Sequence, residues 1–399
     1  MENLSHSLVG AAIAELALPR TAGPAQRRLF FVTGVVAANL PDADLLYTRI
    51  TPPPLGYMLH HRGHTHTLAG VAALALVIGL LAFAPGVRAI VAEWRGRFWA
   101  LAGAALLSHL VLDAWNSYGI HPFYPFDNRW YYGDAVNIVD PWLWAILGVA
   151  AVANTRSRIG RWLLGGLLAV LPLLGVRFGA MAALALVPIA LIAAALAAAG
   201  WRRTAAWRSG TALGATAVYV SGLFAVSAAA RRDVARQPPP DLRGHIVDVI
   251  LRPGLANPLC WNAIAIELKE RDDEFVLRRA VVSPVPGFQR PAGCTTDAHD
   301  ATSTSANGAV RWTAAARQPL GRLRALYRDD CSVRAWMQFG RAPALDDGRI
   351  ADDRFGDPGG SNFTGMPLTP RTDACPPHLT AWVPPRADLL GDDAGSRQE

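Results

Sequence analysis

Four histidines fall within seven positions of this chain: His60, His61, His64 and His66. They lie in the stretch LHHRGHTHT, residues 59–67. Imidazole is the commonest side-chain metal ligand, and its charge changes near neutral pH. A tract this dense can also be a solvated loop, so a metal site would need further ligands from other parts of the chain.

Further candidate ligands lie at the ends of apolar segments. His109 and Asp113 are four residues apart, so on a helix they share one face. An ionisable pair within an apolar segment indicates a functional site, and the alternative is a buried His–Asp hydrogen bond. Asp42 and Asp44, in the sequence PDAD, could bind one cation or act as ligand and base. Their alternative role is capping and solvation at a membrane interface.

The composition favours a membrane protein. Hydrophobic residues make up 52% of the chain and charged residues 17%, and the mean hydropathy is +0.21. These values are too apolar for an ordinary soluble protein of this length. The net charge of +7 could suggest nucleic acid binding. However, the arginines form short clusters between apolar segments, as membrane topology signals do, so no nucleic acid partner is expected.

Eight apolar segments predict membrane helices: residues 8–18, 29–40, 68–84, 98–114, 141–153, 162–176, 178–199 and 210–230. The first two are short for a span, which needs about 20 residues. Twelve arginines lie in four alternate connections, residues 19–28, 85–97, 154–161 and 200–209. The positive-inside rule places these connections in the cytoplasm. The candidate ligands and the C-terminal domain are then expected on the outer side. Three arginines after the last segment count against this topology.

The composition changes near Gln237, and short strand-like runs predict a small α+β domain over residues 241–385. Its four cysteines are the only ones in the chain: Cys260, Cys294, Cys331 and Cys375. We interpret them as two disulfides in an oxidising compartment, with the pairing left open. The alternative is four free thiols in a cytosolic domain.

The predicted fold is an all-α polytopic membrane protein of about eight membrane segments, with a small extracytoplasmic α+β domain at its C-terminal end. We divide it into a metal-dependent core (residues 1–150), further transmembrane helices (151–236), a soluble domain with the four cysteines (237–385) and a disordered tail (386–399). The aromatic segment 118–142 is typical of a membrane-interface belt. It also contains three residues that could bind a metal or hold water: His121, Asp134 and Asp140.

Several motifs in this order resemble the membrane-bound metal-dependent hydrolases of bacterial inner membranes, the YdjM type. The matching pieces are His6, Pro41-Asp42-Ala43-Asp44, His61-Arg62-Gly63-His64-Thr65-His66-Thr67, His109-Leu110-Val111-Leu112-Asp113, Gly119 with Pro122-Phe123, and Asp140-Pro141. Thr67 stands where that family usually has serine. The family is in turn distantly similar to the zinc-dependent phospholipase C and nuclease superfamily, which implies a metal site that cleaves phosphate esters. This chain has one evident HxxxD motif, so one or two metal ions are expected.

The sequence therefore predicts a metal-dependent hydrolase that holds one or two divalent ions, expected to be Zn²⁺. The expected ligands are His6, Asp42, His61, His66, His109 and Asp113. Asp44 or His64 is the candidate base, and Arg62 is the candidate oxyanion clamp. The expected substrate is a phosphate ester of a lipid or lipid-linked molecule at the outer face of the inner membrane.

The sequence also allows two other functions. A metal transporter or sensor would need polar groups in the middle of several helices, and residues 162–230 offer few. A structural or assembly membrane protein could use the metal only to hold its fold. An open coordination position would distinguish an enzyme from this alternative.

Overall fold

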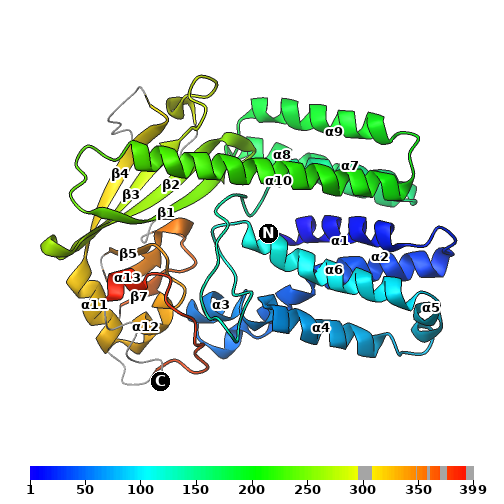
Figure 1. Ribbon diagram of the computed structural model, residues 1–399, viewed down its shortest axis with the longest axis horizontal. Coiled ribbons are helices and arrows are strands. Elements are labelled where there is room, and N and C mark those ends of the chain that lie inside the picture. The colour runs from blue at the N-terminus through cyan, green and yellow to red at the C-terminus, as the bar shows by residue number, and fades with distance from the viewer. Residues whose placement is uncertain (295–307, 347, 357–359, 369–374, 392–399) are drawn as a thin grey trace.

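The computed structural model describes residues 1–294, 308–346, 348–356, 360–368 and 375–391. Helices dominate up to Arg236, and two β-sheets follow (Figure 1). The helices before the sheets are α1 (Asn3–Ala17), α2 (Pro24–Asn39), α3 (Leu55–His60), α4 (Leu68–Leu81), α5 (Val87–Glu93), α6 (Arg95–Ala114), α7 (Pro141–Asn154), α8 (Arg158–Arg177), α9 (Leu186–Gly200) and α10 (Ala205–Arg236). Short 3₁₀ turns are η1 (Leu40–Leu46), η2 (Thr48–Ile50), η3 (His64–His66) and η4 (Ala183–Ala185). Each of the eight predicted apolar segments contains a helix.

Several of these helices begin at a polar side chain that accepts hydrogen bonds from the first turn. The Thr67 hydroxyl accepts from the Gly70 N–H at the start of α4. The Asp140 carboxylate accepts from the N–H groups of Trp142 and Leu143 at the start of α7. Such caps satisfy backbone donors that a helix leaves unpaired at its N-terminus. Asp140, one of the candidate ligands in the aromatic segment, is therefore used as a helix cap.

Helices α1 and α2 approach closely through two glycines. A Cβ placed on Gly10 would lie 2.3 Å from the Gly34 carbonyl oxygen, and one placed on Gly34 would lie 2.5 Å from the Gly10 carbonyl oxygen. No side chain fits in that space, so glycine at both positions allows the two backbones to touch. This contact sets the distance between His6 on α1 and Asp42 just after α2.

Fewer helices than predicted meet the length and hydropathy of a membrane span. Among the residues that the structure describes, five do: 24–50, 95–114, 158–177, 183–200 and 205–236. Residues 55–66 and 68–81 add a sixth if this pair, bent by 69°, counts as one span. Helices α1 and α7, with 15 and 14 residues, are shorter than a span needs. The prediction of about eight spans is therefore confirmed only in part: the eight predicted segments form apolar helices, and five or six of these helices are long enough to span a membrane.

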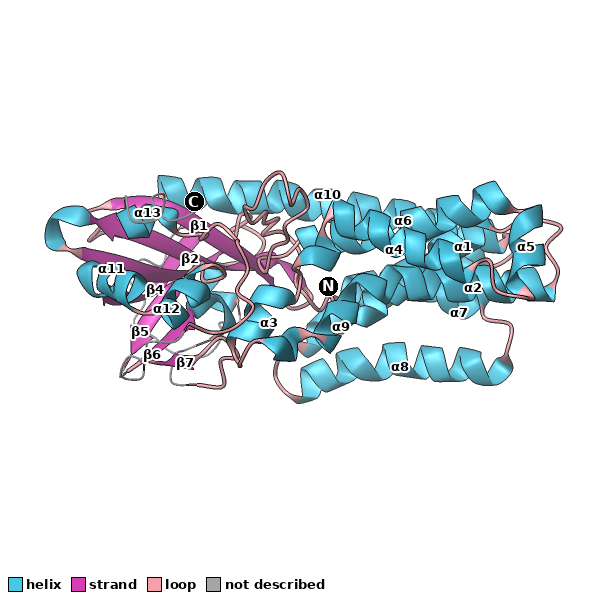
Figure 2. Cartoon of the chain, turned by 90° about the horizontal axis from the view of Figure 1, so that it is seen from below, coloured by secondary structure: helices cyan, strands magenta, loops and turns pink. Residues whose placement is uncertain are grey.

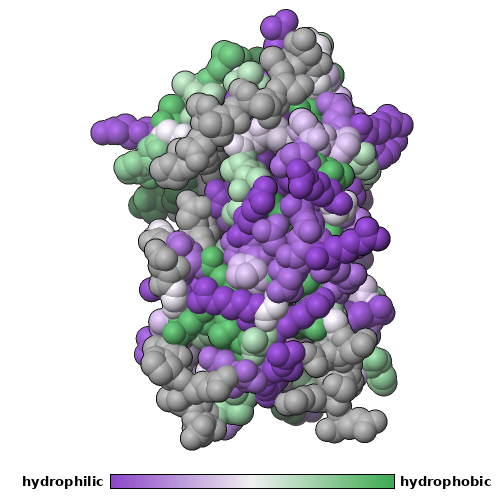
Figure 3. Space-filling model, turned by 90° about the vertical axis from the view of Figure 1, so that its left-hand side faces the viewer, coloured by the Kyte–Doolittle hydropathy of each residue, from purple (hydrophilic) through white to green (hydrophobic). Residues whose placement is uncertain are grey.

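The surfaces of these helices are apolar. Leu80, Trp162 and Leu184 are 73%, 80% and 79% exposed, respectively. Side chains of this kind are buried in a water-soluble fold and are typical of contact with lipid. By contrast, the end of the molecule formed by the sheets shows a largely hydrophilic face (Figure 3).

The helices run side by side, and their connections lie at two opposite ends of the bundle (Figures 1 and 2). The α1–α2 turn, α5, and the α7–α8 and α9–α10 connections lie at the end away from the sheets. These are the four connections in which the sequence places the twelve arginines. Residues 40–66, the end of α6 and the start of α7 lie at the end that faces the sheets.

The C-terminal domain contains both sheets and helices. Its strands and helices are β1 (His245–Gly254), β2 (Asn257–Lys269), β3 (Glu274–Val282), β4 (Val310–Pro319), α11 (Leu320–Asp329), α12 (Cys331–Met337), β5 (Pro343–Asp346), β6 (Arg349–Asp352), β7 (Met366–Pro367) and α13 (Ala387–Leu390). Strands β1 to β4 form an antiparallel sheet in chain order, and β5 to β7 form a second one. Disulfides join Cys260 to Cys294 and Cys331 to Cys375.

The prediction that residues 386–399 form a disordered tail is wrong for the start of that segment. Residues 387–390 form α13, where Leu389 and Leu390 are 0% and 1% exposed. Both side chains belong to the core that α11 and α12 share, so they are held by apolar burial. The rest of that predicted tail, residues 392–399, lies outside the described residues.

Buried charges connect the C-terminal domain to the helical part. The guanidinium of Arg341 donates to both carboxylate oxygens of Asp134 at 2.9 Å and to Asp248 at 2.8 Å. Arg354 donates to the Ser117 carbonyl oxygen at 2.6 Å. Asp134, a second candidate ligand of the aromatic segment, is therefore part of an interdomain ion pair. These contacts fix the loop that follows α6 against the domain.

The disulfide assignment can be tested by thiol labelling. We expect the denatured, non-reduced protein to show almost no reactive cysteine, because Cys260–Cys294 and Cys331–Cys375 close loops of 34 and 44 residues. Loops of this size stabilise a fold by about 3 to 5 kcal/mol each when crosslinked. Four labelled thiols in protein taken directly from the membrane would contradict the assignment.

The orientation in the membrane can be tested with reporter fusions. We expect a reporter at Ala89, within α5, to give a cytoplasmic signal, because the arginine-rich connections lie at that end of the bundle. A reporter attached after α13 is expected to give the opposite signal. Cytoplasmic signals from both positions would overturn the proposed orientation.

Candidate metal centre

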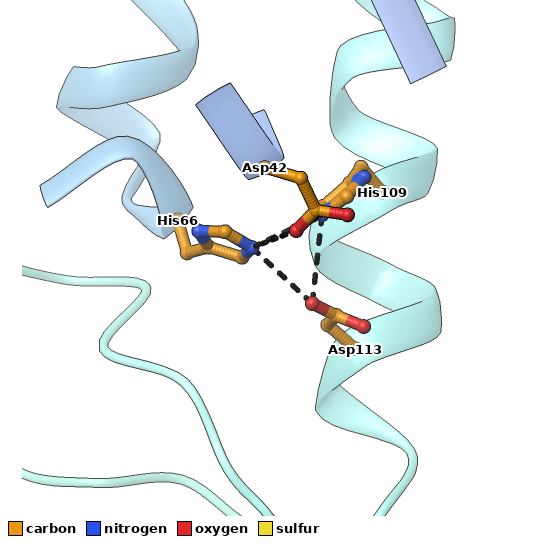
Figure 4. A group of neighbouring side chains, drawn as sticks. All are labelled: Asp42, His66, His109 and Asp113. Carbon is orange, nitrogen blue, oxygen red and sulfur yellow. Dashed lines mark hydrogen bonds and ion pairs between the residues drawn. The ribbon is translucent and has the colours of Figure 1, made fainter. Parts of the chain in front are cut away.

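Four predicted ligands from three separate segments meet at the end of the bundle that faces the sheets (Figure 4). Asp42 lies in η1, which follows α2 directly, and His66 ends η3. His109 and Asp113 lie one turn apart on α6. His66, His109 and Asp113 are fully buried, and the Asp42 side chain is 11% exposed.

The distances within this group fit a tetrahedral ion. The Nε2 atoms of His66 and His109 are 3.0 Å apart. Asp42 Oδ1 lies 3.4 Å from each of these nitrogens, and Asp113 Oδ2 lies 3.3 Å from His66 and 3.5 Å from His109. A tetrahedral zinc ion with bonds of about 2.0 to 2.2 Å separates its ligand atoms by about 3.3 to 3.6 Å. The four atoms are therefore spaced as ligands of one small cation.

The Nδ1 contacts of His66 and His109 determine that Nε2 of each ring faces the other ligand atoms. His109 Nδ1 donates to the Ala38 carbonyl oxygen at 2.7 Å, and His66 Nδ1 lies 3.1 Å from Asp44 Oδ2. A carbonyl or carboxylate oxygen only accepts here, so in the neutral ring the proton lies on Nδ1 and the lone pair on Nε2. When both rings are neutral, as metal-bound imidazoles are, two lone pairs face each other at 3.0 Å. A cation between them removes this repulsion, which supports a metal at this place.

Asp44 holds the loop that carries His66. Its Oδ1 accepts from His61 Nδ1 at 3.0 Å. Its Oδ2 accepts from the Arg62 N–H and the Thr65 hydroxyl, each at 2.9 Å, and faces His66. With both oxygens engaged and the residue fully buried, the carboxylate orients ligands in the way that outer-sphere partners of metal-bound histidines do. This geometry favours a positioning role over the predicted role as a base.

His61 belongs to a second group. This group consists of Asp42, Asp44 and His61. Each residue offers one ligand atom, the three atoms lie within 4.8 Å of one another, and they could hold a further ion. The His61 ring also packs against Tyr57, with ring centres 4.8 Å apart, and its side chain is 10% exposed. His61 and Asp42 are therefore the two members of these groups whose side chains keep slight contact with solvent.

His6 lies beside the four-residue group. Its ring stacks on His109 at 3.8 Å, and its Nε2 is 3.5 Å from Asp113 Oδ1. In the described part of the chain, neither of its buried ring nitrogens has a hydrogen-bond partner. Buried polar atoms are nearly always paired with protein, water or an ion. His6, a predicted ligand, therefore lies next to the centre but is not one of the four residues that form it.

Arg62, the predicted oxyanion clamp, lies next to the centre. Its guanidinium donates to Asp113 Oδ1 at 2.9 Å and to Asn116 Oδ1 at 3.0 Å, and it lies 4.5 Å above the Tyr118 ring. The Arg62 backbone has a φ of 60°, a conformation that residues other than glycine rarely adopt. This turn directs the guanidinium back toward α6, where it compensates the charge of Asp113.

His64, the other candidate base, lies outside both groups. It is exposed, and its ring packs against Tyr124 and Trp382 with ring centres 5.1 Å away in each case. His121 is enclosed between Trp130 and Trp382, at 3.7 and 3.9 Å. Burial lowers the pKa of His121 to about 3, so its ring is neutral at physiological pH. Both histidines pack against aromatic rings and neither joins the metal ligands.

Two contributors to the centre had no clear signal in the sequence: Asn116 and the Ala38 carbonyl. A backbone carbonyl leaves no trace in a sequence, and Asn116 is of a common polar type. Thr65 lies within the histidine-rich motif, but its hydrogen bond to Asp44 became evident only from the fold.

Comparisons with known proteins agree with the resemblance predicted from the motifs. Residues 1–184 match the family model described as "YdjM inner membrane protein". The "Uncharacterized protein YfhP" of Bacillus subtilis (strain 168) is 25% identical over 158 residues, which cover 38% of this chain and 46% of that protein. The chain thus covers less than half of that relative. No solved structure matches. All members of both ligand groups fall within residues 1–184, and the C-terminal domain lies beyond them.

Metal content of the detergent-purified protein tests the site. We expect His66→Ala and His109→Ala each to abolish binding, because each removes one of four nearest ligands. Asp44→Asn keeps all four ligands and should weaken binding about 10-fold to 100-fold, as loss of an outer-sphere partner does. The control is His245→Ala, an exposed histidine at the start of β1. Full metal content in both His66→Ala and His109→Ala would rule out the shared site.

Proposed function

We propose that this chain is a membrane-bound metal-dependent hydrolase that cleaves a phosphate ester of a lipid or lipid-linked substrate at the outer face of the inner membrane. The observation that carries this proposal is the group of Asp42, His66, His109 and Asp113, with ligand spacing that fits one small cation. The family match, which is to an inner membrane protein family, supports the location.

The metal ion, proposed to be Zn²⁺, would lower the pKa of a bound water toward about 7 and polarise a phosphoryl oxygen. The chain's own residues would do the rest. Asp44 and the Ala38 carbonyl hold the two imidazoles with Nε2 inward. The guanidinium of Arg62 lies beside Asp113 and supplies positive charge where a phosphate oxygen would approach.

We assign proton transfer to His61 in place of Asp44 and His64. The Asp44 carboxylate accepts a hydrogen bond from His61 Nδ1 at 3.0 Å, which leaves Nε2 of the neutral ring as a proton acceptor. The His61 ring, with a side chain 10% exposed, lies beside the same carboxylate that orients His66. A histidine oriented by a carboxylate is a common general base.

The surroundings of the centre suit a substrate from the membrane. Leu45, Leu46 and Ile50 are 44%, 87% and 45% exposed, and they lie in η1 and η2, the segment that also carries Asp42. Tyr57, which packs on His61, lines a groove of about 630 Å³. The groove is formed by both parts of the chain: Pro53, Pro54, Tyr57, Phe363, Gly365 and Pro367. An apolar substrate chain could lie there with its phosphate at the metal.

One observation favours a second candidate, a structural metal site without catalysis. Four protein ligands already fill a tetrahedral shell, and structural zinc sites are closed in this way, whereas catalytic sites keep a position for water. Catalysis here requires that one carboxylate gives way, that the coordination number rises to five, or that a second ion binds at Asp42, Asp44 and His61. A transporter or sensor is less favoured, because α8 to α10 carry few polar side chains within their apolar runs.

Hydrolysis assays on phosphomonoesters, phosphodiesters and micellar phospholipids test the proposal. We expect Asp113→Asn to abolish hydrolysis together with metal binding. His61→Ala should retain metal and lower the rate about 10²-fold to 10⁴-fold, the usual contribution of a general base. His64→Ala, in the same loop but outside both groups, is the matched control and should keep the wild-type rate. A metal-loaded wild-type protein without activity on any of these substrates would favour the structural role.

A further inference from the structure

The second half of the helical part contains a cavity, open to the surface, that the metal centre does not use. Its volume is about 780 Å³, within the range of small-molecule pockets. Helices α7, α8, α9 and α10 all contribute to its walls. Figure 2 shows α8 standing apart from the rest of the bundle, and in α8 only Pro172 is buried. Helix α8 therefore needs something other than protein side chains to fill the space behind it.

The walls of this cavity are apolar and made largely of small side chains. On α9, Ala190, Ala193 and Ala197 are spaced to share one helix face, and all three line the cavity. On α8, Gly165 and Ala169 line it from the other side. Water in such a space would find few hydrogen-bond partners. An apolar chain fits it better.

One end of the cavity is positively charged and aromatic. Arg161 near the start of α8 and Arg208 near the start of α10 line it, together with Trp201 and Trp207. Both helix starts lie at the end of the bundle away from the sheets (Figure 1). Tryptophan and arginine at the end of an apolar span are typical of the lipid headgroup region.

The positive charge at this end has no nearby acidic residue in the sequence. Residues 141–232 contain nine arginines and neither aspartate nor glutamate. The hydrogen bonds of the two arginines go to neutral acceptors: Arg161 to the Thr155 carbonyl, and Arg208 to the Asn154 side chain and to the carbonyls of Gly200 and Arg203. Such acceptors orient a guanidinium but leave its charge uncompensated. An anion at this end would supply the compensation.

We propose that this cavity binds one anionic phospholipid, with an acyl chain between α8 and helices α7 and α9 and with the phosphate at Arg161 and Arg208. The apolar walls can bind the acyl chain, because burial of the chain there leaves no polar group without a hydrogen-bond partner. The paired guanidinium groups match the geometry of a phosphate. Such a lipid holds α8 against the bundle. The phosphate end of this site lies near the starts of α8 and α10, whereas the metal centre lies at the opposite end of the helices, which faces the sheets (Figures 1 and 2).

Lipid retention and add-back test this proposal on the full-length, detergent-purified protein. Native mass spectrometry should find about one phospholipid per chain that survives extensive washing. After delipidation, phosphatidylglycerol should raise the thermal unfolding temperature at concentrations at least about tenfold lower than phosphatidylcholine, since a hydrogen bond to a charged group is worth a factor of this size or more. Equal effects of both lipids would overturn the proposal and indicate annular lipid only.

Two variants and two matched controls locate the site. Arg161→Gln removes one charge, and Ala193→Trp fills the cavity. Each should lower the affinity for phosphatidylglycerol about tenfold or more. Arg156→Gln, in the same connection but not in the wall, and Ala195→Trp, exposed on another face of α9, should leave it unchanged. Because the two variants act through charge and volume separately, misfolding of one leaves the other as a test. Wild-type affinity in both would contradict the assignment.

Discussion

Asp113 is a fully buried carboxylate at the end of an apolar helix, and the arrangement around it follows from the need to compensate its charge. An ionised carboxylate loses several kcal/mol of hydration when it is buried, unless opposite charge and hydrogen bonds replace the water. Arg62 and His6 approach one of its oxygens, and His66 and His109 approach the other. Arg62 does so from a backbone in the left-handed conformation. A metal ion at the second oxygen would complete the compensation.

The same requirement explains why three segments far apart in the chain must meet with little tolerance. The contact of α1 with α2 through Gly10 and Gly34 brings His6 and Asp42 to α6. Asp44 then fixes the histidine-rich loop by accepting hydrogen bonds from its backbone and side chains. Any shift of one segment would leave a buried charge or donor without its partner.

The C-terminal domain, which lies beyond the family match, is part of this support. The Trp382 indole donates to the Leu59 carbonyl, immediately before the histidine-rich loop, at 2.9 Å. Leu59 and Met58 belong to the same hydrophobic core as Trp336 and Phe339 of the domain. Arg354 and Arg341 hold the segment after α6 from the other side. The domain and the helical part therefore share a core, and the groove beside Tyr57 is lined by both.

Local patterns in the sequence were enough to predict the eight apolar helices, the His109–Asp113 face and most of the residues that meet at the candidate metal centre, because each of these depends on residue type and short spacing. The two disulfides were predicted from an even number of cysteines confined to one domain. The assignment of roles depended on the tertiary structure. His64 and His66 are two residues apart in one 3₁₀ turn, and only His66 turns toward α6. Asp44 has the same side chain as Asp42 but accepts hydrogen bonds from the histidine-rich loop, so it orients ligands. Three further features also depended on the tertiary structure. They are the pairing of the cysteines, the folding of residues 387–390 and the number of spans of sufficient length. Spacing along a chain determines which residues can share a helix face, but contacts between distant segments determine which side chains are buried, oriented and available to bind a metal.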